Sequence, residues 1–307
     1  MELQWPLILF TFFLCLCGGI LAFQGLLTFL GKGKETQKIA LIAGFIALVI
    51  GGISVFTHLQ HWERIFNGFG ALLVGKGEYG MSGIGLEMWG CVIFVVTEAL
   101  YFLFMRRSEE GVPPKWCAVL AMAVGIALPV VTGDSYLMAA LPAWNTPLLI
   151  LYYLMNTLVM GSIAMMIISN VAKCTDSIEI LGKVAFVCIA IQALVMIIYA
   201  IYITSMGGSW TEIQYYFDPT LPDTHMVDEV ASTAMVTGMR GVVFWLVVIV
   251  IGSLGAMAAL YMIKKNNVED AAKKRIYYIV ALVLVIIAGI VWRCLLYQVA
   301  ISAFAMY

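Results

Sequence analysis

Eight long apolar runs are the feature that most constrains the fold of this chain. A helix needs about 20 apolar residues to cross the hydrocarbon core of a bilayer, and the 307-residue sequence contains eight such runs. They lie at about 5–30, 38–60, 84–106, 115–139, 146–170, 182–206, 236–263 and 276–303. Only 11% of the residues are charged, against about 25% in soluble domains. We therefore expect an all-α integral membrane protein in which residues 1–307 form a single membrane domain of eight transmembrane helices.

The basic residues are concentrated in every second connection between these runs. Thirteen of the 17 lysines and arginines lie in the first, third, fifth and seventh connections, and the other connections are nearly free of them. Short connections rich in lysine and arginine usually face the cytoplasm. The distribution therefore predicts that both termini lie on the outer, extracytoplasmic side of the membrane.

The basic residues that break this pattern point to a polar layer near the outer surface. Arg64 follows the second run by one turn, and Arg240 lies one turn inside the outer end of the seventh run. Arg293 lies about 18 residues into the eighth run, which at about 1.5 Å per residue is the outer leaflet. Ionisable groups at membrane depth are costly and are functional candidates by default. The residues expected in this layer are His58, Arg64, Glu87, Arg240, Arg293 and Tyr297, with Asp134 as a further candidate.

Several of these residues also fit a structural role, and the sequence leaves both interpretations open. Arg240 and Arg293 are long enough to extend to the membrane surface. Glu87 begins a predicted helix, where the helix dipole favours a carboxylate. Glu98 lies eleven residues deeper, near the middle of the bilayer, where it fits either a proton relay or a hydrogen bond between helices.

The residue types narrow the chemistry of the layer. The chain has three histidines, none of them near the middle of a run, and seven cysteines without a CxxC pair. We therefore expect no haem, no iron–sulfur cluster and no metal site in this chain. A quinol fits better, because its oxidation releases two protons that His58 and Glu87 can accept. The electrons must then leave through a partner on the outer side.

Six segments resemble a known family. They are ELQWPLILFT from Glu2, THLQHWERIFN from Thr57, MSGIGLEMWG from Met81, LPAWNTP from Leu141, MVTGMRG from Met235 and WRCLLYQVAIS from Trp292. Together they resemble, over essentially the whole chain, the eight-helix membrane anchor subunit of the dimethyl sulfoxide reductase family of molybdopterin oxidoreductases. The resemblance implies that His58 and Glu87 bind and deprotonate menaquinol, with Arg64 in support. One departure is Gln60, where the family often has glycine.

The same resemblance implies partners and a location. A four-cluster iron–sulfur subunit and a molybdopterin catalytic subunit are expected on the outer face, and the complex is expected in the cytoplasmic membrane of a prokaryote, working in anaerobic respiration. Quinol dehydrogenase activity would then arise only within the complex. One alternative is a proton-coupled transporter that uses Glu87 and Glu98. Another is a purely structural tether whose partner receives electrons from a soluble donor.

Overall fold

The computed structural model describes residues 4–58, 83–138, 141, 143–206 and 232–298. The helices in these residues are α1 (Trp5–Phe29), η1 (Lys34–Thr36), α2 (Gln37–His58), α4 (Gly83–Arg107), α5 (Lys115–Asp134), α6 (Pro147–Val171), α7 (Ile178–Met206), η3 (Ser232–Met235), α8 (Gly238–Val243), η4 (Phe244–Gly255), α9 (Ala256–Lys265) and α10 (Ala271–Gln298). Within the described residues, eight helices are long and apolar enough to cross a membrane, with α8, η4 and α9 joined into the seventh. The predicted all-α architecture and number of spans are confirmed.

The fourth span is shorter in the structure than the sequence predicts. The fourth run was expected to continue to residue 139, whereas α5 ends at Asp134. The chain turns inward after this point, because Tyr136 and Trp144 are buried in the bundle. Helix α6 then begins at Pro147, where the Thr146 hydroxyl accepts a hydrogen bond from the Leu148 backbone N–H at 3.4 Å.

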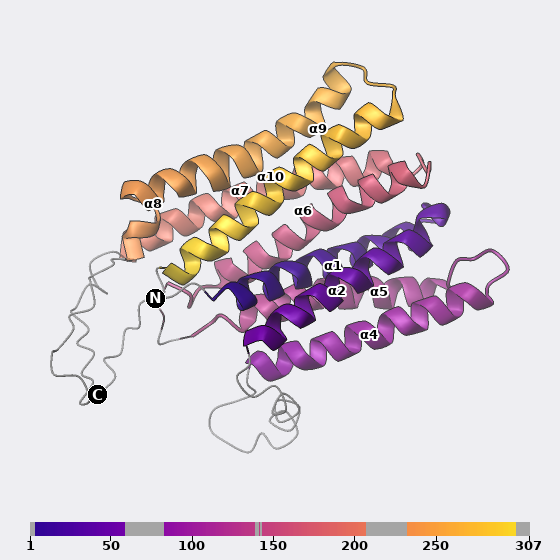
Figure 1. Ribbon diagram of the computed structural model, residues 1–307, viewed down its shortest axis with the longest axis horizontal. Coiled ribbons are helices and arrows are strands. Elements are labelled where there is room, and N and C mark those ends of the chain that lie inside the picture. Colours follow the sequence, from indigo (N-terminus) through magenta and orange to yellow (C-terminus); the bar gives the residue numbers. More distant parts are fainter. Residues whose placement is uncertain (1–3, 59–82, 139–140, 142, 207–231, 299–307) are drawn as a thin grey trace.

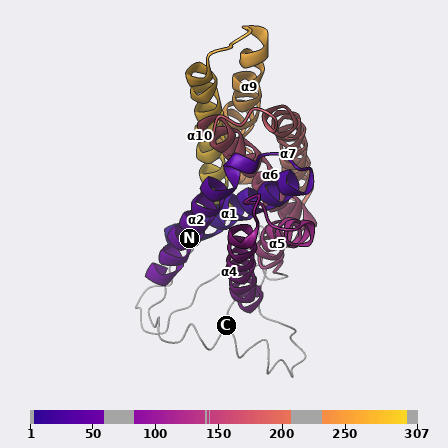
Figure 2. The ribbon, with the colours of Figure 1, turned by 90° about the vertical axis from the view of Figure 1, so that its right-hand side faces the viewer.

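Helix α1 lies at the centre of the bundle. It packs against α2, α5 and α6, and α10 packs in turn against α6, η4 and α9. Figure 2 shows α9 and α10 at one edge of the bundle and α4 at the other, with α1 and α6 between them. Glycines allow the closest contacts, since a Cβ on Gly161 of α6 would clash with the backbone of Gly19, and one on Gly125 of α5 with that of Gly18. Small residues of this kind let membrane helices approach closely.

The seventh span is not a regular α-helix throughout. Residues Phe244–Gly255 form a π-helical stretch between α8 and α9, and π-helical geometry usually occurs only in short insertions. Gly252 lies within this stretch, and a Cβ at this position would clash with the Cβ of Ala288 in α10. The π-helical stretch therefore includes a close contact between the seventh and eighth spans.

All four basic connections lie at one end of the bundle, which we call the basic end (Figure 1). Two of them are tied together by Asp176 in the α6–α7 connection, whose carboxylate accepts hydrogen bonds from the Gly33 N–H at 3.2 Å and from the Cys174 thiol at 2.8 Å. Burial raises the pKa of the Cys174 thiol to about 12, so the thiol stays protonated and able to donate. We call the other end, where α2 ends and α4 begins, the site end.

Candidate functional site

Glu87 is held at the site end by the close approach of two helices. Helix α4 begins at Gly83, where a Cβ would lie 2.8 Å from the Cα of Ser135, the residue that follows α5. Glycine at this position therefore lets the first turn of α4 rest against the end of α5. Glu87 lies one turn further on, only 7% exposed, and its Oε1 is 3.1 Å from the Ser135 hydroxyl.

The Ser135 hydroxyl has two acceptors and one proton. Besides Glu87 Oε1, it lies 2.8 Å from the backbone carbonyl oxygen of Thr132. When its proton is donated within α5, the Glu87 carboxyl loses that hydrogen bond, and when the proton is donated to Glu87 the carboxylate is stabilised. This arrangement suits a carboxyl group that gains and loses a proton, because either state finds a compatible hydroxyl orientation.

An aromatic cluster lies beside this pair. The hydroxyls of Tyr136 and Tyr297 are 2.9 Å apart, and the ring of Tyr136 stacks on that of Tyr153 with a centroid separation of 5.4 Å. Trp144 closes the cluster with its Nε1 donating to the Leu296 carbonyl oxygen at 3.1 Å. Since Ser135 and Tyr136 are consecutive, the cluster connects the surroundings of Glu87 in α4 to Tyr297 in α10.

Arg293 lies one turn deeper in α10 and is fully enclosed, with no exposed surface. Its Nε donates to the Thr11 hydroxyl at 3.2 Å, and both terminal nitrogens lie 3.3 Å from Asn156 Oδ1. The guanidinium also stands over the Tyr153 ring, 5.0 Å from its centroid. No carboxylate among the described residues pairs with it. The positive charge is therefore held by neutral oxygens and aromatic faces, as in a cation–π arrangement.

The structure brings some of the predicted residues together and separates others. Glu87, Tyr297 and Arg293 lie in one layer, linked through Ser135, Tyr136 and Tyr153. Arg240 lies in α8, partly exposed, at the opposite edge of the bundle from α4 (Figure 1).

Three further residues predicted in the polar layer are Asp134, His58 and Arg64. Asp134 is the last residue of α5 and is exposed. His58 ends α2, at the same end of the bundle as the first turn of α4 (Figure 1), but its side chain lies outside the described part of the structure. Arg64 falls in 59–82, also outside the described residues.

Sequence reasoning missed several residues of this layer. Ser135, Tyr136 and Tyr153 form the link between α4 and α10, and Asn156 is the main acceptor of the Arg293 guanidinium. The signal available was weak: a serine–tyrosine pair at the end of a span, and a tyrosine and an asparagine three residues apart within an apolar run, which places them on one helix face.

Glu98 occupies a separate position deeper in α4. It is 5% exposed, and neither carboxyl oxygen has a hydrogen-bond partner among the described residues. Its Oε1 lies against α2, 2.8 Å from where a Cβ on Gly44 would stand. Tyr101, one turn further along α4, is by contrast well bonded, with its hydroxyl 2.8 Å from Gln37 Oε1 and 2.5 Å from the Thr28 hydroxyl.

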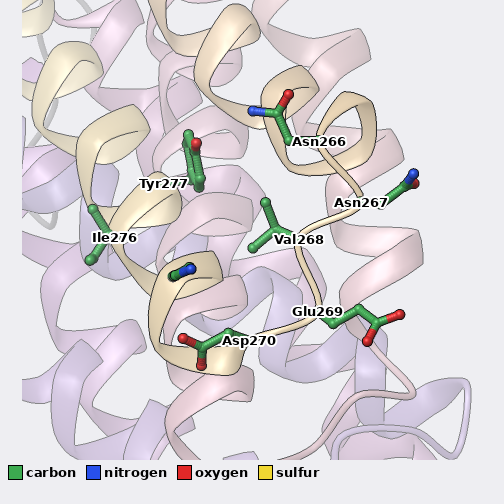
Figure 3. Close-up of a pocket in the computed structure, with 8 residues that line it drawn as sticks. Asn266, Asn267, Val268, Glu269, Asp270, Ile276 and Tyr277 are labelled. Atoms are coloured by element: carbon green, nitrogen blue, oxygen red, sulfur yellow. The ribbon is translucent and has the colours of Figure 1, made fainter.

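A hollow in the turn between α9 and α10 lies away from this layer. Figure 3 shows it at the basic end, where the α9–α10 turn from Asn266 to Asp270 faces Ile276 and Tyr277 of α10. It lies at the other end of the bundle from Glu87 (Figure 1). Among the residues that the structure describes, no group of three histidine, cysteine or acidic side chains is placed to hold a metal ion.

Comparison with known proteins identifies a family for this chain. The family model described as the DMSO reductase anchor subunit (DmsC) matches residues 1–299. A comparison with individually curated proteins gives no match. The family match covers nearly the whole chain, including all eight spans and every residue of the polar layer. The chain therefore belongs to the DmsC family of dimethyl sulfoxide reductase anchor subunits, multi-pass membrane proteins that associate with the catalytic and iron–sulfur subunits of the reductase.

Proposed function

We propose that this anchor subunit oxidises menaquinol at the site end, where α2 ends and α4 begins, with Glu87 and His58 as the two proton acceptors. The observation that carries the proposal is the buried Glu87 carboxyl, held by a hydroxyl that has a second acceptor within α5. Oxidation of one quinol yields a quinone, two protons and two electrons. One proton goes to Glu87 and the other to His58, and the electrons pass to the iron–sulfur partner.

The remaining residues of the layer orient the quinol and shape its surroundings. Arg64 is proposed to direct one quinol oxygen toward His58. Tyr297 and Arg293 act from the α10 side, Tyr297 through its hydrogen bond to Tyr136 and Arg293 through the Tyr153 ring stacked on Tyr136. Because Arg293 is enclosed and its donors are occupied, we propose that it sets the electrostatic potential of the layer and does not touch the quinol itself. Arg240 lies at the other edge of the bundle (Figure 1), so any contact it makes with quinol would be separate from Glu87.

The position of the basic connections supports a proposed orientation of the bundle in the membrane. With the basic connections in the cytoplasm, the site end faces outward, and the iron–sulfur and catalytic subunits dock there. Protons released by the quinol then leave on the same outer side. Quinol oxidation at this site would therefore move no net charge across the membrane.

The test uses the assembled complex and a water-soluble menaquinol analogue as electron donor. Glu87→Gln keeps an acceptor oxygen for Ser135 and removes the ability to take a proton. We expect quinol-dependent reduction of the partner to fall by about 100-fold or more, the usual contribution of general base catalysis. His58→Ala is expected to lower quinol-dependent reduction of the partner by a similar factor.

The matched control is Glu98→Gln, the same change eleven residues along the same helix, about 16 Å away at about 1.5 Å per residue. It is expected to keep quinol turnover close to that of the unmodified complex. Reduction of the partner by a dye that bypasses the membrane subunit checks assembly in every variant. Unchanged quinol turnover in Glu87→Gln would exclude Glu87 from the reaction, and equal loss in both glutamine variants would show that the effect is not specific to Glu87.

A further inference from the structure

A groove at the basic end lies between α7, α9 and α10, away from the polar layer. Its volume is about 750 Å³. Three lysines, one from each helix, line it: Lys183, Lys264 and Lys274. The sixth span and the consecutive seventh and eighth spans thus contribute one positive charge each to the same small region.

The positive charge of the groove is only partly neutralised. Glu179 is the one acidic residue in its lining, and it forms an ion pair with Lys183 at 2.7 Å, one helical turn away. Neither Lys264 nor Lys274 has a side-chain ion pair or hydrogen bond to another described residue. Two ammonium groups therefore remain available to an anion at this level.

The rest of the lining is mostly apolar, and part of it is exposed on the side of the bundle. Phe186 and Val187 of α7 are 40% and 56% exposed, and Leu260 and Ile263 of α9 form the opposite wall. Phe186 and Val187 follow Lys183 by three and four residues, so they lie about one turn further into the membrane on the same face of α7. The groove therefore has a positively charged mouth and an apolar wall along the acyl-chain region.

We propose that this groove binds one anionic phospholipid, with its phosphate between Lys264 and Lys274 and an acyl chain along Phe186 and Leu260. Basic pockets between membrane helices on the cytoplasmic side have the charge and level to hold such head groups. A soluble anion would use only the lysines, whereas a phospholipid also covers the exposed apolar wall. The shape and charge together therefore favour the lipid.

The neighbouring hollow in the α9–α10 turn provides an internal contrast. Its lining includes Glu269 and Asp270 (Figure 3). Lys273 is the one lysine in this lining. The carboxylate of Asp270 accepts a hydrogen bond from the Ala272 N–H at 2.9 Å, which caps the start of α10. This hollow carries net negative charge and would repel a phosphate. Its lysine, Lys273, directly precedes Lys274 and so supplies a control that lies outside the proposed site.

The test compares two double variants in vesicles of phosphatidylcholine containing a minority of phosphatidylglycerol. Lys264→Gln with Lys274→Gln removes the two available charges of the groove. Lys265→Gln with Lys273→Gln removes two adjacent lysines that do not line it, so both variants lose the same net charge. After mild solubilisation of the complex, native mass spectrometry measures the ratio of bound phosphatidylglycerol to bound phosphatidylcholine.

A lysine near the membrane surface contributes about a fivefold preference for an anionic lipid. We therefore expect the ratio to fall by about 30-fold in the groove variant and by less than about twofold in the control. A supplement of inorganic phosphate should not displace the bound lipid. An equal fall in both variants would show a general surface charge effect and overturn the proposal. So would an unchanged ratio in the groove variant, or displacement by phosphate alone.

Discussion

The two sides of α1 hold buried ionisable groups in opposite ways. On the side of α6 and α10, the Arg293 guanidinium is fully enclosed and donates to Thr11 of α1, to Asn156 and to the Gly289 carbonyl oxygen. On the side of α2 and α4, the Glu98 carboxyl is 5% exposed and neither oxygen has a partner among the described residues. Among the described residues, the Arg293 charge is thus well hydrogen-bonded, whereas the Glu98 carboxyl has no hydrogen-bond partner.

The difference teaches which buried group the fold depends on. A buried polar group that loses a partner costs about 1–3 kcal/mol, and more when it is charged. Arg293 therefore ties α1, α6 and α10 together in a defined geometry, and a change to any of its acceptors acts on the assembly of the helices. Glu98 makes no such bonds to the part of the chain that the structure describes, so we expect a change there to leave the helix packing intact. Glu87 lies between these cases, with one hydrogen bond that has a competing acceptor.

The largest effect is expected from Asn156→Leu. Leucine has a similar volume but removes the oxygen that accepts from both terminal nitrogens of Arg293. The guanidinium then stays buried with fewer acceptors, and the free energy of unfolding should fall by about 3 kcal/mol. Equilibrium unfolding in mixed detergent micelles measures the change. A loss below about 1 kcal/mol would show that Arg293 is not a structural tie and would remove the contrast.

A smaller effect is expected at the Tyr136–Tyr297 hydrogen bond. A double-mutant cycle with Tyr136→Phe and Tyr297→Phe should give a coupling free energy of about 1 kcal/mol, since each single change removes the same 2.9 Å contact. Tyr199→Phe serves as a control, because the Tyr199 hydroxyl donates instead to the Ala143 carbonyl oxygen at 2.7 Å. Strict additivity of Tyr136→Phe and Tyr297→Phe would mean that the two hydroxyls do not stabilise each other.

The smallest effect is expected from Glu98→Gln. The carboxyl makes no hydrogen bond to a described residue, so the amide replaces it without breaking one, and the free energy of unfolding should change by less than about 1 kcal/mol. The same unfolding assay serves here. A loss as large as that of Asn156→Leu would show that Glu98 has a partner of its own, and the two sides of α1 would then be alike.

The architecture was largely accessible from the sequence, and the internal contacts were not. Eight apolar runs and the alternation of basic connections are local signals, and they predict the spans within a few residues. Glu87, Arg293 and Tyr297 were placed at one level because helix length converts residue number into depth. Depth does not reveal which helices are neighbours. Sequence therefore does not show that Arg240, which has a similar depth, lies at another edge of the bundle. It also does not identify Asn156 as a partner of Arg293.

The enclosed state of Arg293 illustrates the same point. An arginine near the end of a span extends to the surface or turns inward with equal ease when judged from its own helix. The inward direction of the Arg293 side chain is decided by Thr11 of α1 and Asn156 of α6, which accept hydrogen bonds from its guanidinium. Likewise, the inward turn after Asp134 depends on space beside Tyr153 and Tyr297 for the Tyr136 ring. These are properties of helix pairs, which no single run of sequence encodes.

The central position of α1 has a consequence for biosynthesis. Its glycines meet α5 at Gly125 and α6 at Gly161, and those helices emerge from the ribosome more than a hundred residues later. At about 5–20 residues per second, roughly 10 s pass before α5 and α6 are synthesised. During this time the glycine surfaces of α1 lack the helices that they contact in the folded bundle. The packing of α1 is thus completed only after α5 and α6 have entered the membrane.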